Sequence, residues 1–185
     1  MRDEILAAAR AEFAQYGLAG ARVDRIARAA AASKERLYAH FGDKNALFRA
    51  VVAMDTAEFF RSIPLRPNAI GEFVGEIYDL ALRQPEHVRM NNWARLEGVE
   101  LDEPLAEDEP VVTQAIEAIK IAQAEGYADP SWQPLDLLLM LFGIGLAWAH
   151  SPHPSAATDD PEVIAQRRAA AVEAASRIVR PPSKP

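Results

Sequence analysis

Helical hydrophobic periodicity runs through most of the 185-residue chain, and it constrains the fold more than any other feature of the sequence. Apolar residues recur at spacings of three and four, as Ile5, Ala9 and Phe13 do near the start, and glycines and prolines interrupt the pattern. No segment alternates β-branched and polar residues, as a half-buried strand would. The pattern therefore predicts an all-α protein with about nine helices.

The interruptions divide the chain into segments of helical length. The first helix is expected to end at Gly17, a short second helix to cover residues 23–30, and a third to follow Ser33 as its N-cap. Gly42 and Asp43 then break the chain and cap a longer helix over residues 44–61. Further helices are predicted over residues 69–84, 85–98, 111–125, 134–150 and 162–179, with loops at 101–110 and 151–161 and a disordered tail at 181–185.

The composition excludes several classes of protein. The chain has no cysteine, which removes disulfides and thiolate chemistry. The longest nearly uncharged stretch, residues 137–149, is shorter than the roughly 20 residues that a membrane span requires, and no signal peptide is visible. No glycine-rich phosphate loop, nucleophile motif or metal-binding cluster occurs. We therefore expect a soluble cytoplasmic protein that is not an enzyme, with no cofactor and no membrane partner.

Charge is distributed unevenly along the chain, whose net charge is −7. Residues 1–52 contain nine basic and six acidic residues, a net of +3, and the remaining residues carry a net of −10. Because salt screens charges that lie more than about 8 Å apart at physiological ionic strength, phosphate attraction depends on local charge. A basic N-terminal segment on an acidic body is therefore compatible with DNA binding.

The first 52 residues have the pattern of a tri-helical helix-turn-helix. A tight turn at Ala31-Ala32 separates the predicted second and third helices. In such motifs the second helix braces the backbone, and the start of the third enters the major groove, where the base edges can be distinguished. The sequence therefore predicts a DNA-binding domain over residues 1–52, followed by a helical domain over residues 53–180.

The start of the third helix carries side chains that suit base recognition. Lys34 or Arg36 could donate to guanine, and Glu35 could accept from the amino group of cytosine. Tyr38 could contact a phosphate or a thymine methyl group, although it could also be a half-buried aromatic. Lys44 begins the next helix, where its ammonium and the free N–H groups could hold a phosphate.

The string Ser33-Lys34, then Leu37-Tyr38-Ala39-His40-Phe41, then Lys44 and Leu47, resembles the signature of the tetracycline-repressor (TetR) family. The resemblance covers about the first 52 residues. It implies a homodimer on a palindromic double-stranded operator and release from DNA when a small-molecule effector binds. It also implies that residues 53–180 form the effector-binding and dimerisation domain, with an all-helical pocket for the effector. It also implies a set of DNA-contacting residues: Arg22, Ser33, Lys34, Glu35, Arg36, Tyr38, His40 and Lys44.

Three features depart from the family pattern. Ala31 stands where the turn usually carries glycine, so a positive φ there would cost on the order of 1 kcal/mol. Arg22 replaces a small hydroxyl residue and could still reach a phosphate. No basic arm precedes the first helix, so the sequence does not favour a minor-groove contact from the N-terminus.

Two further groups of residues are candidates for the remaining functions. A small set of polar groups among apolar side chains suits an effector pocket, although aromatics at helical spacing are also common in plain cores. The pocket candidates are Tyr78, His87, Met90, Asn91, Trp93 and Trp132. The strongly apolar segment 134–150, with the last helix, suits a four-helix dimer interface or an ordinary buried helix. The interface candidates are Leu135, Leu138, Leu139, Phe142, Leu146, Trp148, Ile164 and Arg168.

Two groups could suggest a metal, but the sequence favours none. His150 and His153 are three residues apart, yet prolines break the helix that would align them. The acidic residues between 102 and 109 lack the ligand spacing of a calcium loop and suit a solvated loop. The alternative to a ligand-responsive repressor is a helical DNA-binding or interaction protein that has no effector. The sequence does not identify the effector, the operator or the regulated genes.

Overall fold

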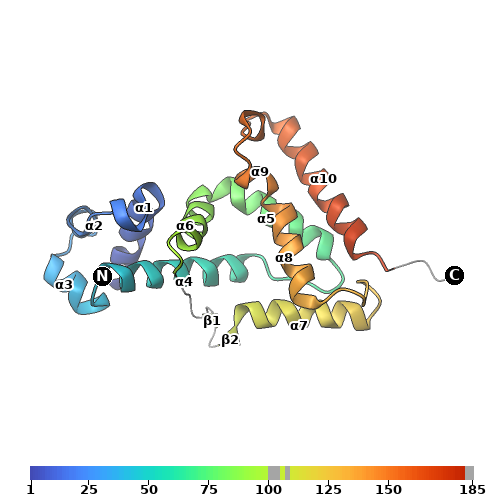
Figure 1. Ribbon diagram of the computed structural model, residues 1–185, viewed down its shortest axis with the longest axis horizontal. Helices are drawn as coiled ribbons and strands as arrows, with labels where there is room; N and C mark the ends of the chain where they lie inside the picture. Colours follow the sequence, from blue (N-terminus) through green and yellow to red (C-terminus); the bar gives the residue numbers. More distant parts are fainter. Residues whose placement is uncertain (100–104, 107–108, 182–185) are drawn as a thin grey trace. The chain divides into compact units, whose positions relative to one another are not determined.

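The computed structural model describes residues 1–99, 105–106 and 109–181 (Figure 1). Its helices form two compact units, one of residues 1–59 with 84–108 and the other of residues 60–83 with 109–185. The all-α prediction is confirmed: the described residues contain ten α-helices, one short 3-10 helix and two strands of two residues each. Residues 182–185 of the tail predicted at 181–185 and most of the predicted acidic loop lie outside the described residues.

Unit 1 contains α1 to α4, up to Phe59, and α6. Their bounds are α1 (Arg2–Gly20), α2 (Val23–Ala29), α3 (Lys34–Phe41), α4 (Lys44–Ser62) and α6 (Pro85–Leu96). The predicted stop at Gly17 is present as a kink with φ of 66°, after which α1 continues for one turn. Gly42 ends α3 with φ of 79°, and the Asp43 carboxylate accepts from the N–H of Ala46 at 2.7 Å, which caps α4.

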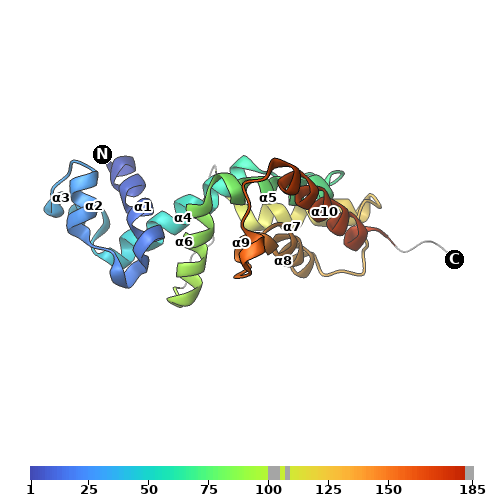
Figure 2. The same cartoon turned by 90° about the horizontal axis from the view of Figure 1, so that it is seen from above.

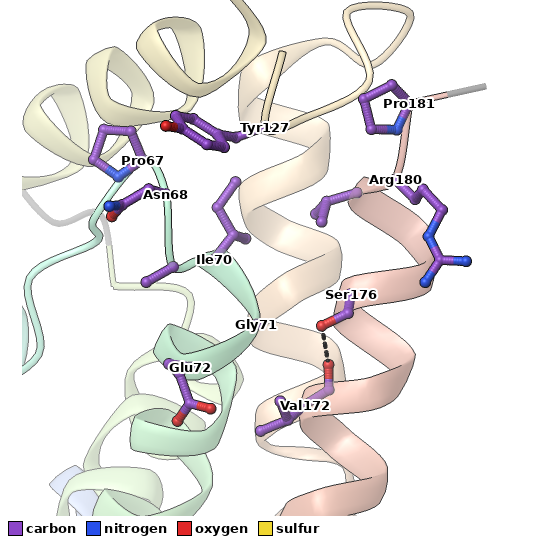
Figure 3. Close-up of a pocket in the computed structure, with 12 residues that line it drawn as sticks. Pro67, Asn68, Ile70, Gly71, Glu72, Tyr127, Val172, Ser176, Arg180 and Pro181 are labelled. Carbon is purple, nitrogen blue, oxygen red and sulfur yellow. Dashed lines mark hydrogen bonds between the residues drawn. The ribbon is translucent and has the colours of Figure 1, made fainter. Parts of the chain in front are cut away.

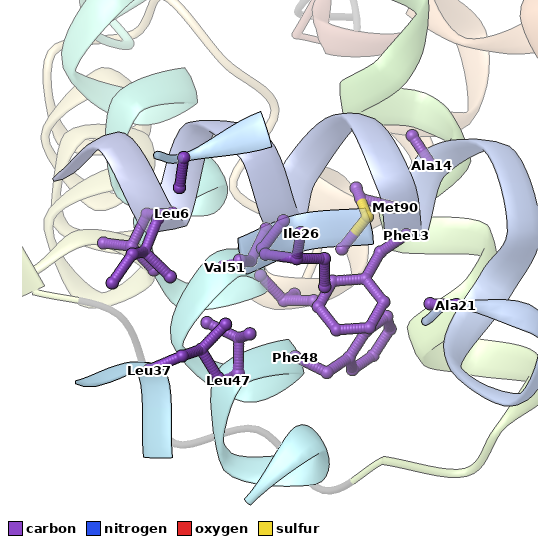
Figure 4. Close-up of a cluster of buried hydrophobic side chains, with 14 of the residues drawn as sticks. Leu6, Phe13, Ala14, Ala21, Ile26, Leu37, Leu47, Phe48, Val51 and Met90 are labelled. Atoms are coloured by element: carbon purple, nitrogen blue, oxygen red, sulfur yellow. The ribbon is translucent and has the colours of Figure 1, made fainter. Parts of the chain in front are cut away.

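Large apolar side chains from five helices fill the core of unit 1 (Figure 4). Phe13 of α1 meets Phe48 of α4 edge to face, with ring centroids 5.0 Å apart. Ile26 of α2 and Leu37 of α3 are fully buried against them. This core fixes the position of α3, because Leu37 lies in the middle of that eight-residue helix.

Helix α6 belongs to the same core although more than 40 residues separate it from α3 in the chain. Met90 is fully buried in the cluster, and Trp93 lies against the kink of α1. A side-chain carbon at Gly17 would lie 2.8 Å from the Trp93 ring, so glycine is required there both for the positive φ and for the ring. The Trp93 indole N–H donates to the carbonyl of Ala14 at 3.4 Å.

Unit 2 contains the end of α4 and the helices α5 (Ile70–Arg83), α7 (Val111–Ala124), α8 (Pro134–Gly145), α9 (Ala147–His150) and α10 (Pro161–Val179), with the 3-10 helix η1 (Pro154–Ala156). Helices α5 and α10 lie side by side (Figure 2). Glycine permits this contact, because a side-chain carbon at Gly75 would lie 2.9 Å from Arg168 and Val172. Two short strands precede α7 in the chain: β1 (Leu105–Ala106) belongs to unit 1 and β2 (Glu109–Pro110) to unit 2.

The helix predicted over 134–150 is divided into α8 and α9. Leu146, between them, has φ of −93° and ψ of 1°, outside the helical range. Gly143 and Gly145 precede it, and glycine lowers helix stability by roughly 1 kcal/mol relative to alanine, so the break falls where the helix is weakest. Among the helices that the structure describes, none is long and apolar enough to span a membrane.

Candidate DNA-binding interface

The outer surface of α3 is built around one buried residue. Leu37 is fully buried, whereas Lys34, Glu35, Arg36 and Tyr38 are exposed. Ser33 is the N-cap that the sequence predicts, and its hydroxyl accepts from the N–H of Arg36 at 3.2 Å. The start of α3 is therefore a capped helix end that presents polar side chains to solvent.

Charged groups at this helix end differ in how they are held. The Lys34 ammonium lies 2.5 Å from a carboxylate oxygen of Asp24 on α2. Glu35 accepts from its own backbone N–H and from Ser33, and these bonds lower the pKa of its carboxyl group. Arg36, by contrast, makes no ion pair with any residue that the structure describes, so its guanidinium is available to an external acceptor.

The remaining predicted contacts surround α3. Tyr38 is 43% exposed, which excludes a core role for its ring, and His40 is also exposed. Arg22 is exposed at the N-cap of α2. The Lys44 ammonium donates to the carbonyls of Ala19 and Ala21 at 3.4 and 3.3 Å, so it ties the start of α4 to the α1–α2 junction.

Sequence reasoning missed a buried acid that supports α2. Glu12 of α1 is only 9% exposed, and its carboxylate accepts from the backbone N–H of Arg22 at 2.8 Å and from the Arg25 guanidinium at 2.8 and 3.0 Å. Burial alone would raise the pKa of Glu12, but Arg25 and the Arg22 N–H outweigh it and lower that pKa. The Arg25 guanidinium also stacks over the Tyr16 ring at 4.3 Å.

The turn between α2 and α3 has the positive φ at which alanine, unlike glycine, is strained. Ala31 has φ of 48°, the one positive φ outside glycine among the described residues. The N–H of Ala32 donates to Ala27 and that of Ala31 to Arg28, which is the Schellman pattern. The same two bonds end α6 and α7, where Gly98 and Gly126 take the left-handed position.

Comparison with known proteins agrees with this geometry. Residues 5–51 match the bacterial regulatory proteins of the tetR family, and residues 69–177 match the tetracyclin repressor-like C-terminal domain. The transcriptional repressor SCO4008 of Streptomyces coelicolor is 33% identical over 149 residues, which is 80% of this chain and 77% of that protein. The chain belongs to the TetR family. It is therefore a helix-turn-helix, DNA-binding transcriptional regulator.

Two further relatives of this TetR-family chain support the assignment. The solved structure of the transcriptional regulator SCO4942 from S. coelicolor is 37% identical, with a TM-score of 0.81 over 98% of this chain and 99% of that one. The repressor AcnR of Corynebacterium efficiens is 40% identical over 62 residues, 34% of this chain and 33% of that protein. The first similarity covers both units, and the second covers a third of the chain.

In this TetR-family regulator, the six residues predicted for the effector pocket fall into two groups. His87, Met90, Asn91 and Trp93 belong to α6 in unit 1, whereas Tyr78 and Trp132 belong to unit 2. Within unit 2, Tyr78 packs edge to face on Trp148, and the Trp132 indole donates to the carbonyl of Ile178.

His87 and Asn91 take part in a buried polar cluster within unit 1. His87 Nδ1 lies 3.4 Å from a carboxylate oxygen of Asp55, which is 3% exposed, and the Asn91 amide lies 2.9 Å from His87 Nε2. The Arg10 guanidinium lies 2.5 Å from the other oxygen of Asp55, and the His87 ring stacks on Phe59. The cluster connects α1, α4 and α6. Among the described residues, no three His, Asp or Glu side chains are placed to hold a metal ion.

Unit 2 contains a pocket of about 410 Å³ that the sequence gave no reason to expect (Figure 3). It lies between the start of α5 and the end of α10, with Tyr127 at one side and Ile70 and Val179 among its apolar walls. Ser176 faces it, although its hydroxyl already donates to the carbonyl of Val172. None of the six predicted effector residues lines this pocket.

The predicted dimer residues differ in exposure within unit 2. Leu135 and Leu139 of α8 are 47% and 61% exposed, whereas Leu138 is buried. Phe142 packs on Phe60 and Phe73 in the core of the unit. Leu146, Trp148 and Ile164 are half-buried, and Arg168 pairs with Asp79 and Glu72 of α5 in the same chain. The surface of α8 therefore carries an apolar strip of Leu135 and Leu139, one turn apart.

Proposed function

We propose that the chain is a cytoplasmic, ligand-responsive repressor that binds a palindromic operator as a homodimer and leaves it when a small-molecule effector binds. In this proposal residues 1–52 supply DNA binding, and residues 53–180 supply effector binding and dimerisation. The observation that carries the proposal is the capped start of α3, where Lys34, Glu35, Arg36 and Tyr38 are exposed opposite the buried Leu37.

Selection of bound sequences from random duplex DNA tests operator recognition. Wild-type protein should enrich a palindrome, because a homodimer presents two copies of α3 to half-sites about one helical turn, roughly 34–36 Å, apart. Arg36→Ala should weaken binding by about 5- to 150-fold, since one good base contact contributes about 1–3 kcal/mol. Arg83→Ala, which removes an exposed arginine of unit 2, is the matched control. Failure of the wild type to enrich any sequence would contradict the proposal.

Sedimentation velocity tests the homodimer. The exposed Leu139 should lie against a second copy, because an apolar strip on α8 is the surface that a four-helix dimer interface needs. Leu139→Asp should shift the protein from dimer to the 20.3 kDa monomer and weaken operator binding. Ile121→Asp places the same charge at an exposed apolar position of α7, 48% exposed, and should leave the dimer intact. A dimer that survives Leu139→Asp would contradict this interface.

A thermal-shift screen of small molecules tests the effector. A ligand at a concentration 100 times its Kd should stabilise the protein by about 2.7 kcal/mol, because it binds the folded state and not the unfolded state. A true effector must also lower operator affinity, because a ligand shifts a conformational equilibrium only by its different affinities for the two states. Asn91→Ala and Tyr78→Phe should each reduce the shift if the predicted residues hold the ligand. Operator binding that no ligand changes would favour the alternative, a regulator without an effector.

A further inference from the structure

Asp24 stands out because it is an acid beside a surface that is proposed to meet DNA phosphates. It is the second residue of α2, it is 61% exposed, and its carboxylate lies 2.5 Å from the ammonium of Lys34, the first residue of α3. A carboxylate at that position should weaken attraction to DNA. A salt bridge between exposed side chains contributes little to stability, and an acid in the first turn of α2 adds only a small amount more.

The position of Lys34 on α3 indicates a function for the Asp24–Lys34 ion pair. Leu37 is buried in the core and Lys34 lies three residues earlier on α3. The Lys34 ammonium lies against Asp24, so its side chain is at the flank of α3 that borders α2. A lysine there has four rotatable bonds and would move freely between phosphates. Asp24 holds its ammonium on this flank, and the bond also raises the pKa of Lys34. Two of its three N–H donors remain for a base edge.

We propose that Asp24 is a positioning residue for specificity: it keeps Lys34 from the phosphates and directs its ammonium to a base in the major groove. This rests on the proposed operator binding through α3. An ion pair has a shorter-ranged field than a free ammonium, so Asp24 reduces attraction to DNA of any sequence more than it reduces a base contact at hydrogen-bond distance. Arg36 has no carboxylate partner among the described residues, so no ion pair restrains its guanidinium when it contributes to DNA binding.

The experiment compares binding profiles of the full-length protein on randomised half-sites. Lys34→Ala should erase the base preference at one position of each half-site, which identifies the base that Lys34 contacts. Asp24→Asn should weaken the preference at that same position by about threefold or more and leave other positions unchanged. It should also steepen the dependence of log affinity on log salt for random DNA by about 0.9 per protomer. The double variant should have the profile of Lys34→Ala.

Control variants separate positioning from charge and folding. Asp24→Glu keeps the carboxylate and should retain the wild-type profile and salt dependence. Glu125→Gln removes one charge from an exposed position of unit 2 and should change neither. Three results would each overturn the proposal. Asp24→Asn could keep the wild-type profile, Asp24→Asn could lose base preference equally at all positions, or Lys34→Ala could lose base preference at no single position. Absence of any enriched sequence with the wild type would instead overturn the proposed function.

Discussion

The strained turn before the recognition helix predicts that Ala31→Gly stabilises the protein. The left-handed conformation destabilises a folded chain by roughly 1–2 kcal/mol per L-residue, and glycine removes this strain. Glycine also raises the entropy of the unfolded chain, which offsets about 0.4–1 kcal/mol of the gain. The φ of 48° at Ala31 therefore predicts a net gain of about 0.5–1 kcal/mol. In a chain of this size, 1 kcal/mol raises the melting temperature by about 2–4 °C. Gly98 and Gly126 occupy the same position in the same turn elsewhere in the chain.

Urea unfolding, followed by circular dichroism, measures the change, and hydrogen exchange of residues 23–41 assigns it to the turn. Ala29→Gly is the matched control, because Ala29 is an exposed helical residue two positions earlier. It should lose about 0.5–1 kcal/mol, since glycine weakens a helix without relieving any strain there. A loss in Ala31→Gly equal to that in Ala29→Gly would refute the strain argument. Operator affinity should change little, because glycine adopts the same turn.

Other contacts of unit 1 carry further predictions. The pKa of Glu12 is lowered in the folded protein, so its ionised carboxylate stabilises the fold fully above the unfolded value of about 4.5. That stabilisation is lost as pH falls through the folded pKa. In urea titrations, Glu12→Gln should therefore lose less stability than the wild type as pH falls below about 4.5. Gly17→Ala should destabilise by more than about 1 kcal/mol and alter Trp93 fluorescence, because the methyl group meets the ring and φ is 66°. Asp55→Ala should lower the unfolding free energy by about 1–3 kcal/mol, because it removes the partner of the Arg10 Nε while Glu58 still pairs with the other end of that guanidinium.

Local signals made the helices predictable. A helix cap acts within three or four residues, so Ser33 and the Gly42-Asp43 pair marked the ends of α3 and the start of α4 from sequence alone. At Ala31 the family resemblance, which places glycine at this turn, indicated where a positive φ would strain an alanine, and φ there is 48°. Helix boundaries then followed the prediction to within a few residues, except where α8 and α9 divide.

Contacts between distant residues were not predictable, because periodicity shows that a face is apolar but not which helix covers it. Glu12 and Asp55 resembled ordinary solvated acids, since their arginine partners come from other helices. On α8, which is apolar all round, the sequence could not separate the buried Leu138 from the exposed Leu139 next to it. The same ambiguity made Trp93 a candidate for a ligand pocket.

The packing of α6 on α1 joins the proposed effector response to the DNA-binding helices. Residues 1–52 do not complete the core of unit 1, because Met90 and Ala94 of α6 are buried in it and Trp93 lies on the kink at Gly17. Displacement of α6 must therefore either move α1 with it or separate the Trp93 ring from that kink and expose apolar surface. Either change alters α1, the helix whose Glu12 holds α2 in place. In the proposed mechanism, an effector that moves α6 by its differential affinity would act on the recognition helix through these contacts.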